Sequence, residues 1–415
     1  MDIKTYIHTI SGKAKEASVV LRSLKAEQKN QALGNLAELL AEKKAEIKDA
    51  NSGDCRNAEQ AGVSSAFLDR LALTDKRIEV MIKSVREIMS LSDPVGESCG
   101  VRRPEGFFLE KIRIPVGVVA MIYESRPNVT VDAASLCIKS GNAVILRGGK
   151  DALESNKTLA LIIKEALKKA DIPPECVQCV ERTEHEGVTY LVKQAGLIDL
   201  VIPRGGESLI RKVDREAEVP VIKHYKGVCH LYIDREADLD MGLEVVYNAK
   251  VQRPGTCNAL ETLLVNQEVA RDFLPRLVTK LGEVGLRGCS RSRSIVPRMK
   301  EASEEDYYTE YLDMVLSVKV VDSVEQAVSH IEKYGSSHTD GIISSNIATI
   351  QKFVSSVDSA VVTVNASTRL SDGGVFGLGA EIGISTDKLH ARGPMGIREL
   401  TTYKWVLRGE GDIRK

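Results

Sequence analysis

One cysteine has neighbours that favour covalent chemistry. Cys257 follows a polar Pro-Gly turn that begins at Arg253, and the apolar, β-prone segment 260–265 comes directly after it. A turn places a thiol for access rather than for packing, and a thiolate attacks electrophilic carbonyl carbons. Most free cysteines are instead small buried hydrophobes. This alternative stays open because sequence does not show the local pKa that controls thiol reactivity.

Two basic, glycine-rich turns predict where a dinucleotide binds. The segments RGGK (147–150) and PRGGES (203–208) each follow an apolar, strand-like run, and the second leads into helical sequence. Glycines let backbone N–H groups approach a phosphate, and a helix N-terminus attracts its charge. Ordinary turns between strands and helices also contain glycine, but two basic ones favour the cofactor. The glycines of GLGAEIG (377–383) have the wrong spacing for a dinucleotide fingerprint.

Composition limits the class of protein. The 415 residues are too many for one core and imply two or three domains. The net charge of -1 argues against nucleic-acid binding through bulk electrostatics. The N-terminus lacks the apolar region of a signal peptide, and the most apolar run, 114–123, is about half of a membrane span. We therefore expect no nucleic-acid partner, no membrane segment and a cytoplasmic location.

The cysteines do not predict a disulfide scaffold or a metal site. Eight in a chain of this length are too sparse for a disulfide framework and suit a reducing compartment. Cys176 and Cys179 form a CxxC motif, but there is no second pair and no nearby histidine at zinc-finger spacing. Both cysteines lie in a strand-like segment, which favours two core-facing residues. The sequence thus predicts no metal.

The first hundred residues have the pattern of helices. Residues 3–50 show the 3.6-residue apolar period, and the polar residues 51–54 interrupt it. A further helix is expected from an N-cap at Thr74 to about Leu91.

An alternating pattern follows the helices. Residues 101–116 contain a Pro-Glu-Gly turn at 104–106 and then alternate apolar with polar residues, which predicts a two-stranded ribbon. The tail 401–409 alternates in the same way and needs a partner strand. Residues 107–114 could be that partner, within one subunit or between two.

From residue 117, apolar strands alternate with amphipathic helices, which is typical of parallel sheets with crossover helices. In the first half, strands are expected at 118–123, 143–147, 177–180 and 198–202, and helices at 130–140, 153–169 and 186–195. In the second half, helices are expected at 237–250, 267–282, 323–334 and 346–356, and strands at 260–265, 314–321, 341–344 and 360–364.

Five long segments resemble a known family: IPVGVVAMIYESRPNVTVDAA (114–134), KSGNAVILRGGK (139–150), NAKVQRPGTCNALETLLV (248–265), VDSVEQAVSHIEKYGSSHTDGI (321–342) and VNASTRLSDGGVFGLGAEIGISTDKLHARGPMG (364–396). Nearly end to end, the chain resembles the γ-glutamyl phosphate reductases, or glutamate-5-semialdehyde dehydrogenases, of the aldehyde dehydrogenase superfamily. The resemblance implies NADPH-dependent reduction of L-glutamyl 5-phosphate to L-glutamate 5-semialdehyde and phosphate, the second step of proline biosynthesis from glutamate.

The fold class that follows is α/β and aldehyde dehydrogenase-like, with a Rossmann-type cofactor domain, an α/β catalytic domain and a small β oligomerisation arm. The expected domains are 1–100 with 117–231 for NADPH binding, 232–362 for catalysis, 101–116 with 387–415 for the oligomerisation ribbon and tail, and 363–386 for a crossover from the catalytic domain.

The resemblance also implies catalytic roles. By its place in the motif, Cys257 is similar to the family's nucleophile, which displaces phosphate to form a thioester that hydride transfer then releases as the aldehyde. The superfamily stabilises the oxyanion with the cysteine's own N–H and an asparagine. Asn128 is the candidate, although the segment YESRPN (123–128) departs from the usual loop. His224 stands where hydrolytic members carry a general-base glutamate, and the loss of that base suits a reductase.

Binding residues follow from the same resemblance. Those implied for NADPH are Arg147 and Lys150 at the 2′-phosphate, Gly205, Gly206 and Ser208 at the pyrophosphate, and Glu310 at the nicotinamide ribose. Those implied for the substrate are Arg253 at the acyl phosphate, Ser367, Thr368 and Arg369 at the amino-acid end, and His338 in the signature GSSHTD.

Two other interpretations were weighed. A hydrolytic or CoA-acylating aldehyde dehydrogenase is disfavoured by the missing glutamate and by the segment 364–396. A non-catalytic scaffold that kept the fold is disfavoured by the intact motif around Cys257. The expected partners are the small-molecule substrate, further copies of the chain in a homo-oligomer, and functional coupling to a glutamate 5-kinase.

Overall fold

The structure, a computed structural model, describes residues 1–103 and 106–414 and divides the chain into two compact units. Unit 1 comprises Met1–Lys223, Gly377–Gly383 and Met395–Lys415, and unit 2 comprises His224–Phe376 and Ile384–Pro394. The chain therefore passes between the units four times. Two short strands, β14 (Gly383–Ser385) and β15 (Gly393–Met395), lie at the last two crossings and form a two-stranded sheet.

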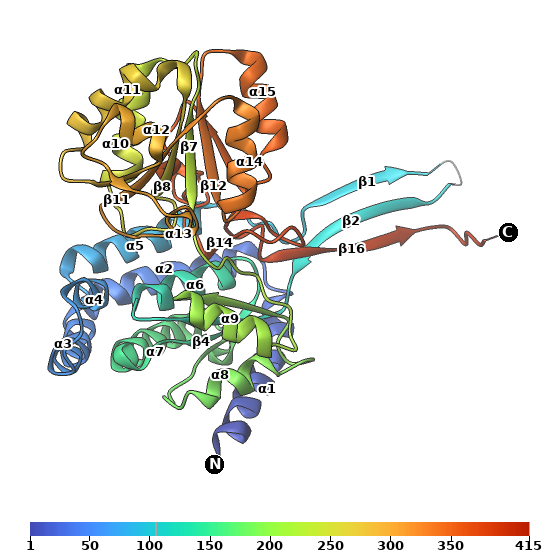
Figure 1. Ribbon diagram of the computed structural model, residues 1–415. Helices are drawn as coiled ribbons and strands as arrows, with labels where there is room; N and C mark the ends of the chain where they lie inside the picture. Colours follow the sequence, from blue (N-terminus) through green and yellow to red (C-terminus); the bar gives the residue numbers. More distant parts are fainter. Residues whose placement is uncertain (104–105, 415) are drawn as a thin grey trace. The chain divides into compact units, whose positions relative to one another are not determined.

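Unit 1 contains a parallel sheet of four strands in the order β5-β4-β3-β6. Its strand β4 is labelled in Figure 1. Its strands are β3 (Val118–Tyr123), β4 (Ala143–Arg147), β5 (Val177–Cys179) and β6 (Leu200–Arg204). The helices along this part of the chain are α6 (Asn128–Lys139), η1 (Lys150–Ala152), α7 (Leu153–Lys169), η2 (Pro174–Cys176), α8 (Glu186–Val192) and α9 (Glu207–Glu216). Every residue of β3 and β4 is buried, as expected for a parallel sheet that is covered on both faces. The predicted alternation of strands and helices is confirmed.

The helices before this sheet differ from the prediction at one place. They are α1 (Ile3–Leu21), α2 (Ala26–Glu42), α3 (Lys44–Gln60), α4 (Ser65–Leu71) and α5 (Asp75–Ser90). The break predicted at residues 51–54 is wrong, because α3 runs through them. Two polar residues there are buried and bonded: Asn51 donates to the Leu71 carbonyl at 2.9 Å, and Asp54 accepts from the Ser155 amide at 2.8 Å. The N-cap at Thr74 is confirmed, since its hydroxyl accepts from the Arg77 amide.

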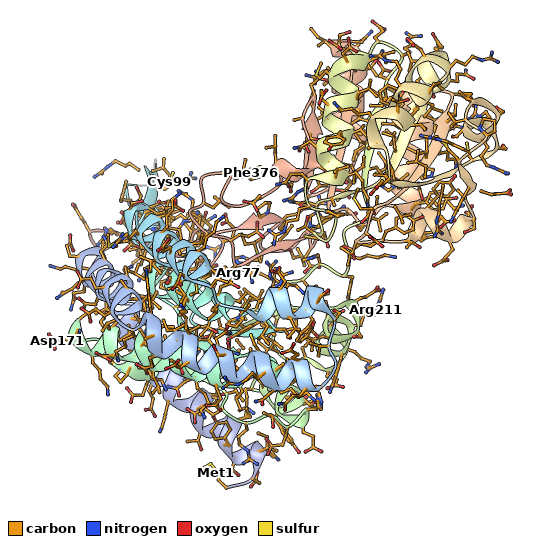
Figure 2. The ribbon with its side chains drawn as sticks, turned by 90° about the vertical axis from the view of Figure 1, so that its left-hand side faces the viewer. Met1, Arg77, Cys99, Asp171, Arg211 and Phe376 are labelled. Carbon is orange, nitrogen blue, oxygen red and sulfur yellow. The ribbon has the colours of Figure 1, made fainter. Side chains whose placement is uncertain are left out.

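A three-stranded antiparallel ribbon completes unit 1. Its strands are β1 (Ser98–Arg102), β2 (Phe108–Pro115) and β16 (Thr401–Arg408), in the order β1-β2-β16. The predicted pairing of the tail with residues 107–114 is confirmed, and it forms within one chain. The exposed Cys99 lies on β1 (Figure 2). Residues 104–105 of the predicted Pro-Glu-Gly turn lie outside the described residues.

Unit 2 contains a parallel sheet of seven strands in the order β10-β9-β11-β8-β7-β12-β13. Its strands are β7 (Cys229–Ile233), β8 (Leu260–Asn266), β9 (Gly285–Gly288), β10 (Lys300–Glu301), β11 (Val315–Val321), β12 (Thr339–Ile343) and β13 (Val361–Val364). Its helices are α10 (Leu239–Val251), α11 (Gln267–Leu281), α12 (Ser290–Ile295), α13 (Glu304–Tyr308), α14 (Val324–Tyr334), α15 (Ile347–Ser356) and η3 (Thr368–Leu370).

Helices cover both faces of the sheet in unit 2. Leu231 and Leu263 pack in one core with side chains of α10 and α11. Their chain neighbours Tyr232 and Leu264 pack in a second core with side chains of α14 and α15. Because successive strand residues face opposite sides, the strands are apolar on both faces, which is why they read as continuous apolar runs.

The observed units differ from the expected domain bounds in several places. Most of the expected crossover 363–386 belongs to unit 2, which continues to Phe376. The boundary expected at 231–232 falls inside β7. This strand pairs with β8 and β12, and unit 2 already begins at His224. The expected tail 387–415 is also divided, because residues 387–394 belong to unit 2. There Arg392 pairs with Asp358 at 2.7 Å. Among the described residues, no helix is long and apolar enough to cross a membrane.

His330, on α14, is buried among aromatic rings of unit 2. Its ring centroid lies 4.3 Å from that of Tyr334, 5.0 Å from Tyr307 and 5.4 Å from His230. Among the described residues, neither of its ring nitrogens has a hydrogen-bond partner. Burial, aided by the neighbouring His230, lowers the pKa of His330 to about 2. The imidazole therefore stays neutral in the folded chain at every pH in the ordinary working range.

Replacement His330→Phe is expected to make the chain more resistant to acid. The unfolded chain protonates this histidine near pH 6.5, whereas the folded chain does not until about pH 2, so stability present above pH 6.5 is lost as the pH falls. Between pH 6.5 and 4.5 the loss is roughly 2–3 kcal/mol of unfolding free energy. Urea unfolding at pH 6.5 and pH 4.5 measures this loss. The free energy of unfolding should fall less for His330→Phe than for wild type or for the exposed control His8→Asn. An equal fall in all three chains would contradict the assignment.

Candidate active site

The turn that carries Cys257 is closed by a buried ion pair. Lys250 lies in the last turn of α10 and Glu261 lies near the start of β8, so the pair brackets the turn on both sides. Their side chains meet at 2.7 Å and are both fully buried. Burial raises the pKa of Glu261 to about 7 and lowers that of Lys250. The second carboxylate oxygen of Glu261 accepts from the Leu312 amide at 3.1 Å, which further fixes the start of β8.

Short hydrogen bonds hold the turn itself. The Thr256 hydroxyl donates to the Arg253 carbonyl at 2.9 Å, and the Ala259 amide donates to the Thr256 carbonyl at 2.9 Å. The Asn258 amide group donates to the Ser371 carbonyl at 2.8 Å. Cys257 sits between these anchors and is half-buried. Cys257 is therefore not a core residue. Cys176 and Cys179, by contrast, are buried in the core as predicted, and burial raises their pKa values to about 12.

Backbone of the preceding segment packs closely on the cysteine. A Cβ atom on Gly227 would lie 1.8 Å from the Cys257 carbonyl oxygen, so only glycine fits there. The Gly227 amide donates to the Glu310 carboxylate at 2.9 Å. The buried Cys229 thiol donates to the Cys257 carbonyl at 3.2 Å, and burial holds the pKa of Cys229 well above its ordinary value. Glu310 is thus tied to the backbone beside the cysteine, and its predicted contact with the nicotinamide ribose stays a prediction.

Two histidines flank the Cys257 sulfur. One ring nitrogen of His224, one of His338 and the sulfur all lie within 4.8 Å of one another. The two rings meet edge to face, with centroids 5.4 Å apart. Nδ1 of His224 lies 2.8 Å from the Ile384 carbonyl, and Nδ1 of His338 lies 2.9 Å from the Thr339 hydroxyl. The structure thus brings the predicted His338 to the cysteine, and it adds His224, to which sequence reasoning gave no role.

Two arginines bring positive charge to the same turn. Arg369 donates from Nε to Gln252 at 2.9 Å and from Nη1 to the Asn258 side chain. Burial lowers the pKa of Arg369 first, and the positive charge of Arg253 lowers it further. Arg369 therefore lies within electrostatic reach of Arg253, and of the Cys257 sulfur as well.

Ser367 and Thr368, also predicted to bind the substrate, lie at the start of η3. The Ser367 hydroxyl accepts from the Arg369 amide at 3.3 Å and caps η3. Thr368 is fully buried, and its hydroxyl has no hydrogen-bond partner within the described part of the chain. Their contact with an amino-acid substrate stays a prediction.

Asn128 begins helix α6 in unit 1. Its side-chain amide donates to Asp132, one turn further along the helix, at 3.1 Å. Asp132 also accepts from Ser84 at 3.1 Å, and burial raises the pKa of its carboxyl group. Asn128 thus belongs to unit 1 and Cys257 to unit 2, and the role of Asn128 as an oxyanion donor stays a prediction.

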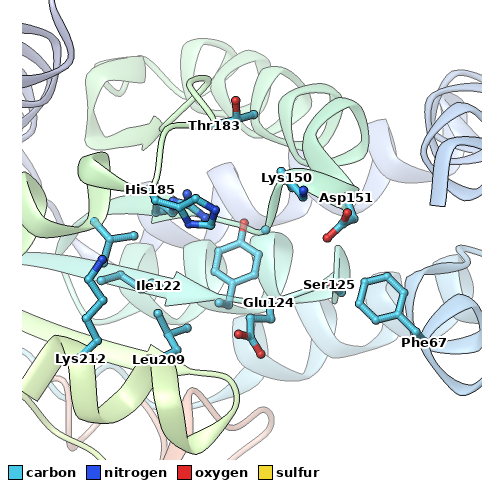
Figure 3. Close-up of a pocket in the computed structure, with 14 residues that line it drawn as sticks. Phe67, Ile122, Glu124, Ser125, Lys150, Asp151, Thr183, His185, Leu209 and Lys212 are labelled. Carbon is cyan, nitrogen blue, oxygen red and sulfur yellow. The ribbon is translucent and has the colours of Figure 1, made fainter. Parts of the chain in front are cut away.

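A cavity of about 350 Å³ lies at the carboxyl ends of β3 and β4 in unit 1. Arg147 and Lys150, predicted at the cofactor phosphate, both line it, and Lys212 and His185 add two further groups that can carry positive charge. Figure 3 shows Lys150, Lys212 and His185 around this cavity, with the aromatic side chain of Phe67 at its edge. The position matches the site where open parallel sheets bind their ligands.

The cavity has two features that fit an anionic ligand. Arg147 is almost fully buried, burial lowers its pKa, and its Nε has no hydrogen-bond partner among residues 1–103 and 106–414. A Cβ atom on Gly149 would come within 3.2 Å of the Ser125 amide nitrogen, so the glycine keeps the backbone accessible. Nη1 of Arg147 donates to the Gly148 carbonyl at 2.8 Å, and a phosphate would add a partner for Nε.

The predicted pyrophosphate loop begins helix α9, but a protein carboxylate occupies its end. The Gly206 amide donates to Glu124 at 3.0 Å, and a Cβ atom on Gly205 would lie 2.7 Å from the Glu124 carboxyl carbon. A carboxylate at this position uses the same N–H group and the same helix dipole that a phosphate would use. The roles of Gly205, Gly206 and Ser208 therefore stay predictions.

Comparisons with known proteins agree on one family. The family model described as "Aldehyde dehydrogenase family" matches residues 4–305. The chain is 49% identical to a γ-glutamyl phosphate reductase of Thermodesulfovibrio yellowstonii and 51% identical to one of Desulfotalea psychrophila, each over 100% of both chains. The crystal structure of γ-glutamyl phosphate reductase from Thermotoga maritima is similar with a TM-score of 0.97 and 47% identity, covering 99% of this chain and 100% of that one.

Proposed function

Since the chain belongs to the γ-glutamyl phosphate reductase family, within the aldehyde dehydrogenases, we propose that it reduces L-glutamyl 5-phosphate with NADPH. The products are L-glutamate 5-semialdehyde and phosphate. The family makes the chain an oxidoreductase of proline biosynthesis. The finer proposal concerns the cofactor and the path, in which a thioester on Cys257 is the intermediate.

One observation supports this path most directly. Cys257 is half-buried in a fixed turn with two imidazoles next to its sulfur and the Arg369 guanidinium within electrostatic reach. The thiolate is the nucleophilic form of cysteine, and the proposed reaction begins from it. A substrate with a phosphate and a carboxylate matches the positive charge at the turn, and Arg253 and Arg369 are the residues we assign to its anionic groups.

The proposed reaction has two steps. The Cys257 thiolate attacks the acyl carbon, a carbon–sulfur bond forms, and the bond from carbon to the phosphate oxygen breaks. When bound, NADPH would supply the hydride that adds to the thioester carbon. The carbon–sulfur bond then breaks, which releases the aldehyde and regenerates the Cys257 thiolate. The Cys257 N–H and Asn128 are the groups we assign to the developing oxyanion in both steps.

The residues around the cavity of unit 1 fit a phosphate-bearing dinucleotide. Arg147 offers a buried Nε that has no hydrogen-bond partner in the described part of the chain, and Lys150 and Lys212 line the same cavity. A group with several anionic oxygens satisfies more of these donors than a ribose hydroxyl does. Arg147 and Lys150 would therefore hold the 2′-phosphate, which favours NADPH over NADH.

A coupled assay tests the proposed function. Glutamate 5-kinase, ATP and glutamate generate the unstable acyl phosphate in place, and the absorbance of the reduced nicotinamide reports turnover. The reverse reaction, from glutamate 5-semialdehyde and phosphate with NADP+, avoids the unstable substrate. We expect turnover in both directions and a strict need for phosphate in the reverse one. Reverse turnover that needs no phosphate would favour hydrolytic aldehyde oxidation.

Replacement Lys150→Ala is expected to weaken the binding of NADPH more than the binding of NADH. Loss of a charge-assisted contact to the 2′-phosphate should raise KM for NADPH about tenfold or more and leave KM for NADH within about twofold. Initial rates with both nicotinamides measure the two constants. The control is Lys168→Ala, which removes an exposed lysine on α7. Equal increases for both nicotinamides would remove Lys150 from the 2′-phosphate site.

Two partner predictions belong with this proposal. The ribbon strand β16 exposes Tyr403, Trp405 and Leu407, an apolar set that a second copy of the chain could cover. We therefore keep the homo-oligomer as a proposal, and sedimentation of the purified chain tests it. Functional coupling to a glutamate 5-kinase is likewise proposed, because the acyl phosphate substrate is unstable and must be used soon after it forms.

A further inference from the structure

The three side chains at the Cys257 sulfur come from the amino ends of three adjacent strands. Cys257 precedes β8, His224 precedes β7 and His338 immediately precedes β12, and the sheet order places β8, β7 and β12 side by side. Their sulfur and nitrogen atoms consequently lie within 4.8 Å of one another although the residues are far apart in sequence. The parallel sheet therefore builds a cluster of one thiol and two imidazoles.

Hydrogen bonds fix which nitrogen of each imidazole carries a lone pair. The Ile384 carbonyl can only accept, so Nδ1 of His224 is the protonated nitrogen at that 2.8 Å contact. The Thr339 hydroxyl donates to Ser371 at 2.9 Å, so it accepts from Nδ1 of His338. In both neutral rings the lone pair is then on Nε2. A metal-bound histidine typically donates its other N–H to a carbonyl or hydroxyl in this way, and the donation strengthens it as a ligand.

We propose that this cluster binds Zn²⁺ and that the bound ion inhibits the enzyme by occupying the nucleophile. One thiolate and two imidazoles are ligands that Zn²⁺ prefers and that Mg²⁺ and Ca²⁺ do not. A water molecule or a substrate oxygen would complete the tetrahedron. On binding, the Cys257 S–H proton passes to solvent, a sulfur–zinc bond forms, and no oxidation state changes. The buried Cys229 thiol donates to the Cys257 carbonyl and is not one of the three clustered groups.

The geometry needs only small side-chain movements. Zinc bonds of about 2.3 Å to sulfur and about 2.0 Å to nitrogen place tetrahedral ligand atoms roughly 3.3–3.6 Å apart. The three atoms here lie within 4.8 Å of one another, so no separation has to shorten by more than about 1.5 Å. His338 is fully buried and fixed, whereas Cys257 and His224 are half-buried. The latter two are the residues with room to adjust.

Direct binding to the whole, substrate-free chain tests the site. With a phosphine reductant in place of chelating thiols, we expect one Zn²⁺ per chain by calorimetry. Co²⁺ as a spectroscopic probe should give the near-ultraviolet charge-transfer band of a cobalt–thiolate bond. Cys257→Ala should abolish that band, and His224→Asn should weaken Zn²⁺ binding at least about tenfold, since loss of even an outer hydrogen bond to a metal ligand costs that much. His338→Gln is a further variant, to be used if circular dichroism shows that it folds.

Matched controls separate this site from other thiols and histidines. Cys99→Ser removes an exposed cysteine of the ribbon, and His8→Asn removes an exposed histidine of α1, so both should bind Zn²⁺ as wild type does. Ca²⁺ and Mg²⁺ at equal concentration should not displace Co²⁺. No cobalt–thiolate band in wild type, or unchanged Zn²⁺ affinity in Cys257→Ala, would overturn the proposal.

The inhibitory part rests on the proposed function, whereas the binding part does not. Zn²⁺ should lower the reductase rate and slow the alkylation of Cys257 by iodoacetamide over the same concentration range. A chain that binds Zn²⁺ at this cluster but lacks reductase activity would refute the proposed function alone. A chain that is an active reductase but shows no Zn²⁺ binding at Cys257 would refute the zinc site alone.

Discussion

Replacement Cys257→Ala is expected to lower kcat/KM for glutamyl phosphate reduction by at least about 10⁴-fold, the scale seen when the nucleophile of a covalent mechanism is removed. Without the sulfur no thioester forms, and hydride would have to attack the acyl phosphate itself. The residues that hold the turn, Lys250, Thr256 and Asn258, are unchanged in this variant, so the substrate should still bind. The loss should therefore fall mainly on kcat.

The measurement needs both assay directions and a thiol control. Turnover of Cys257→Ala is compared with that of wild type and of Cys99→Ser, which removes another accessible thiol outside unit 2. Cys257→Ser should recover little activity, because a serine hydroxyl is hardly ionised at neutral pH. Near wild-type turnover in Cys257→Ala, with the fold confirmed by circular dichroism, would rule out the thioester path.

The sheets could be predicted because their signal is local. Val118–Tyr123 and residues 143–146 are apolar at every position, and buried parallel strands show this pattern. The helix boundary at 51–54 could not be predicted in this way. Asn51 and Asp54 favour turns by propensity, but in α3 they bond to the Leu71 carbonyl and the Ser155 amide, which lie far along the chain. Tertiary contacts thus outweighed local preference.

Candidate site residues could be named where they lie inside a continuous motif. Cys257, Arg253 and Arg369 are such candidates because their segments are long and specific, and their roles stay predictions. The second histidine could not be assigned from pattern, because His224 and Cys257 approach only after β7 pairs with β8. Likewise, nothing local marks the carboxylate of Glu124 as the group at the start of α9. Such contacts depend on sheet order, which a single sequence specifies only through the whole fold.

The second large effect is expected on stability, when the ion pair between Lys250 and Glu261 is broken. Replacement Lys250→Met would leave the Glu261 carboxyl buried without its partner, and breaking such a pair costs about 3–5 kcal/mol. The pair is not a strong net stabiliser when intact: burial already raises the pKa of Glu261 to about 7 and lowers that of Lys250, so the interior opposes both charges. The stability lost in Lys250→Met therefore comes from leaving the Glu261 charge buried without a partner, and not from losing a strongly favourable ion pair.

Removing the charge of Glu261 as well should restore part of the stability that Lys250→Met loses. Lys250→Met with Glu261→Gln keeps an oxygen to accept from the Leu312 amide and removes the buried charge. We expect this double variant to regain more than about half of the stability lost in the single one. The defect of Lys250→Met should also grow as the pH rises from about 5 to 8. A carboxyl group whose folded pKa is raised contributes its stability at low pH and loses it as the pH rises through that pKa.

Amide hydrogen exchange of β8 is the suitable measurement, because the single tryptophan of the chain, Trp405, lies in unit 1 and does not report on this turn. A loss of 3–5 kcal/mol corresponds to exchange roughly 10²–10⁴-fold faster at sites that open with unit 2. The same loss should free the turn and slow the reductase beyond what the unfolded fraction explains, since Lys250 and Glu261 position Cys257 from both sides. If β8 exchanges equally in wild type and Lys250→Met while activity still falls, Lys250 acts near the substrate and not through the turn.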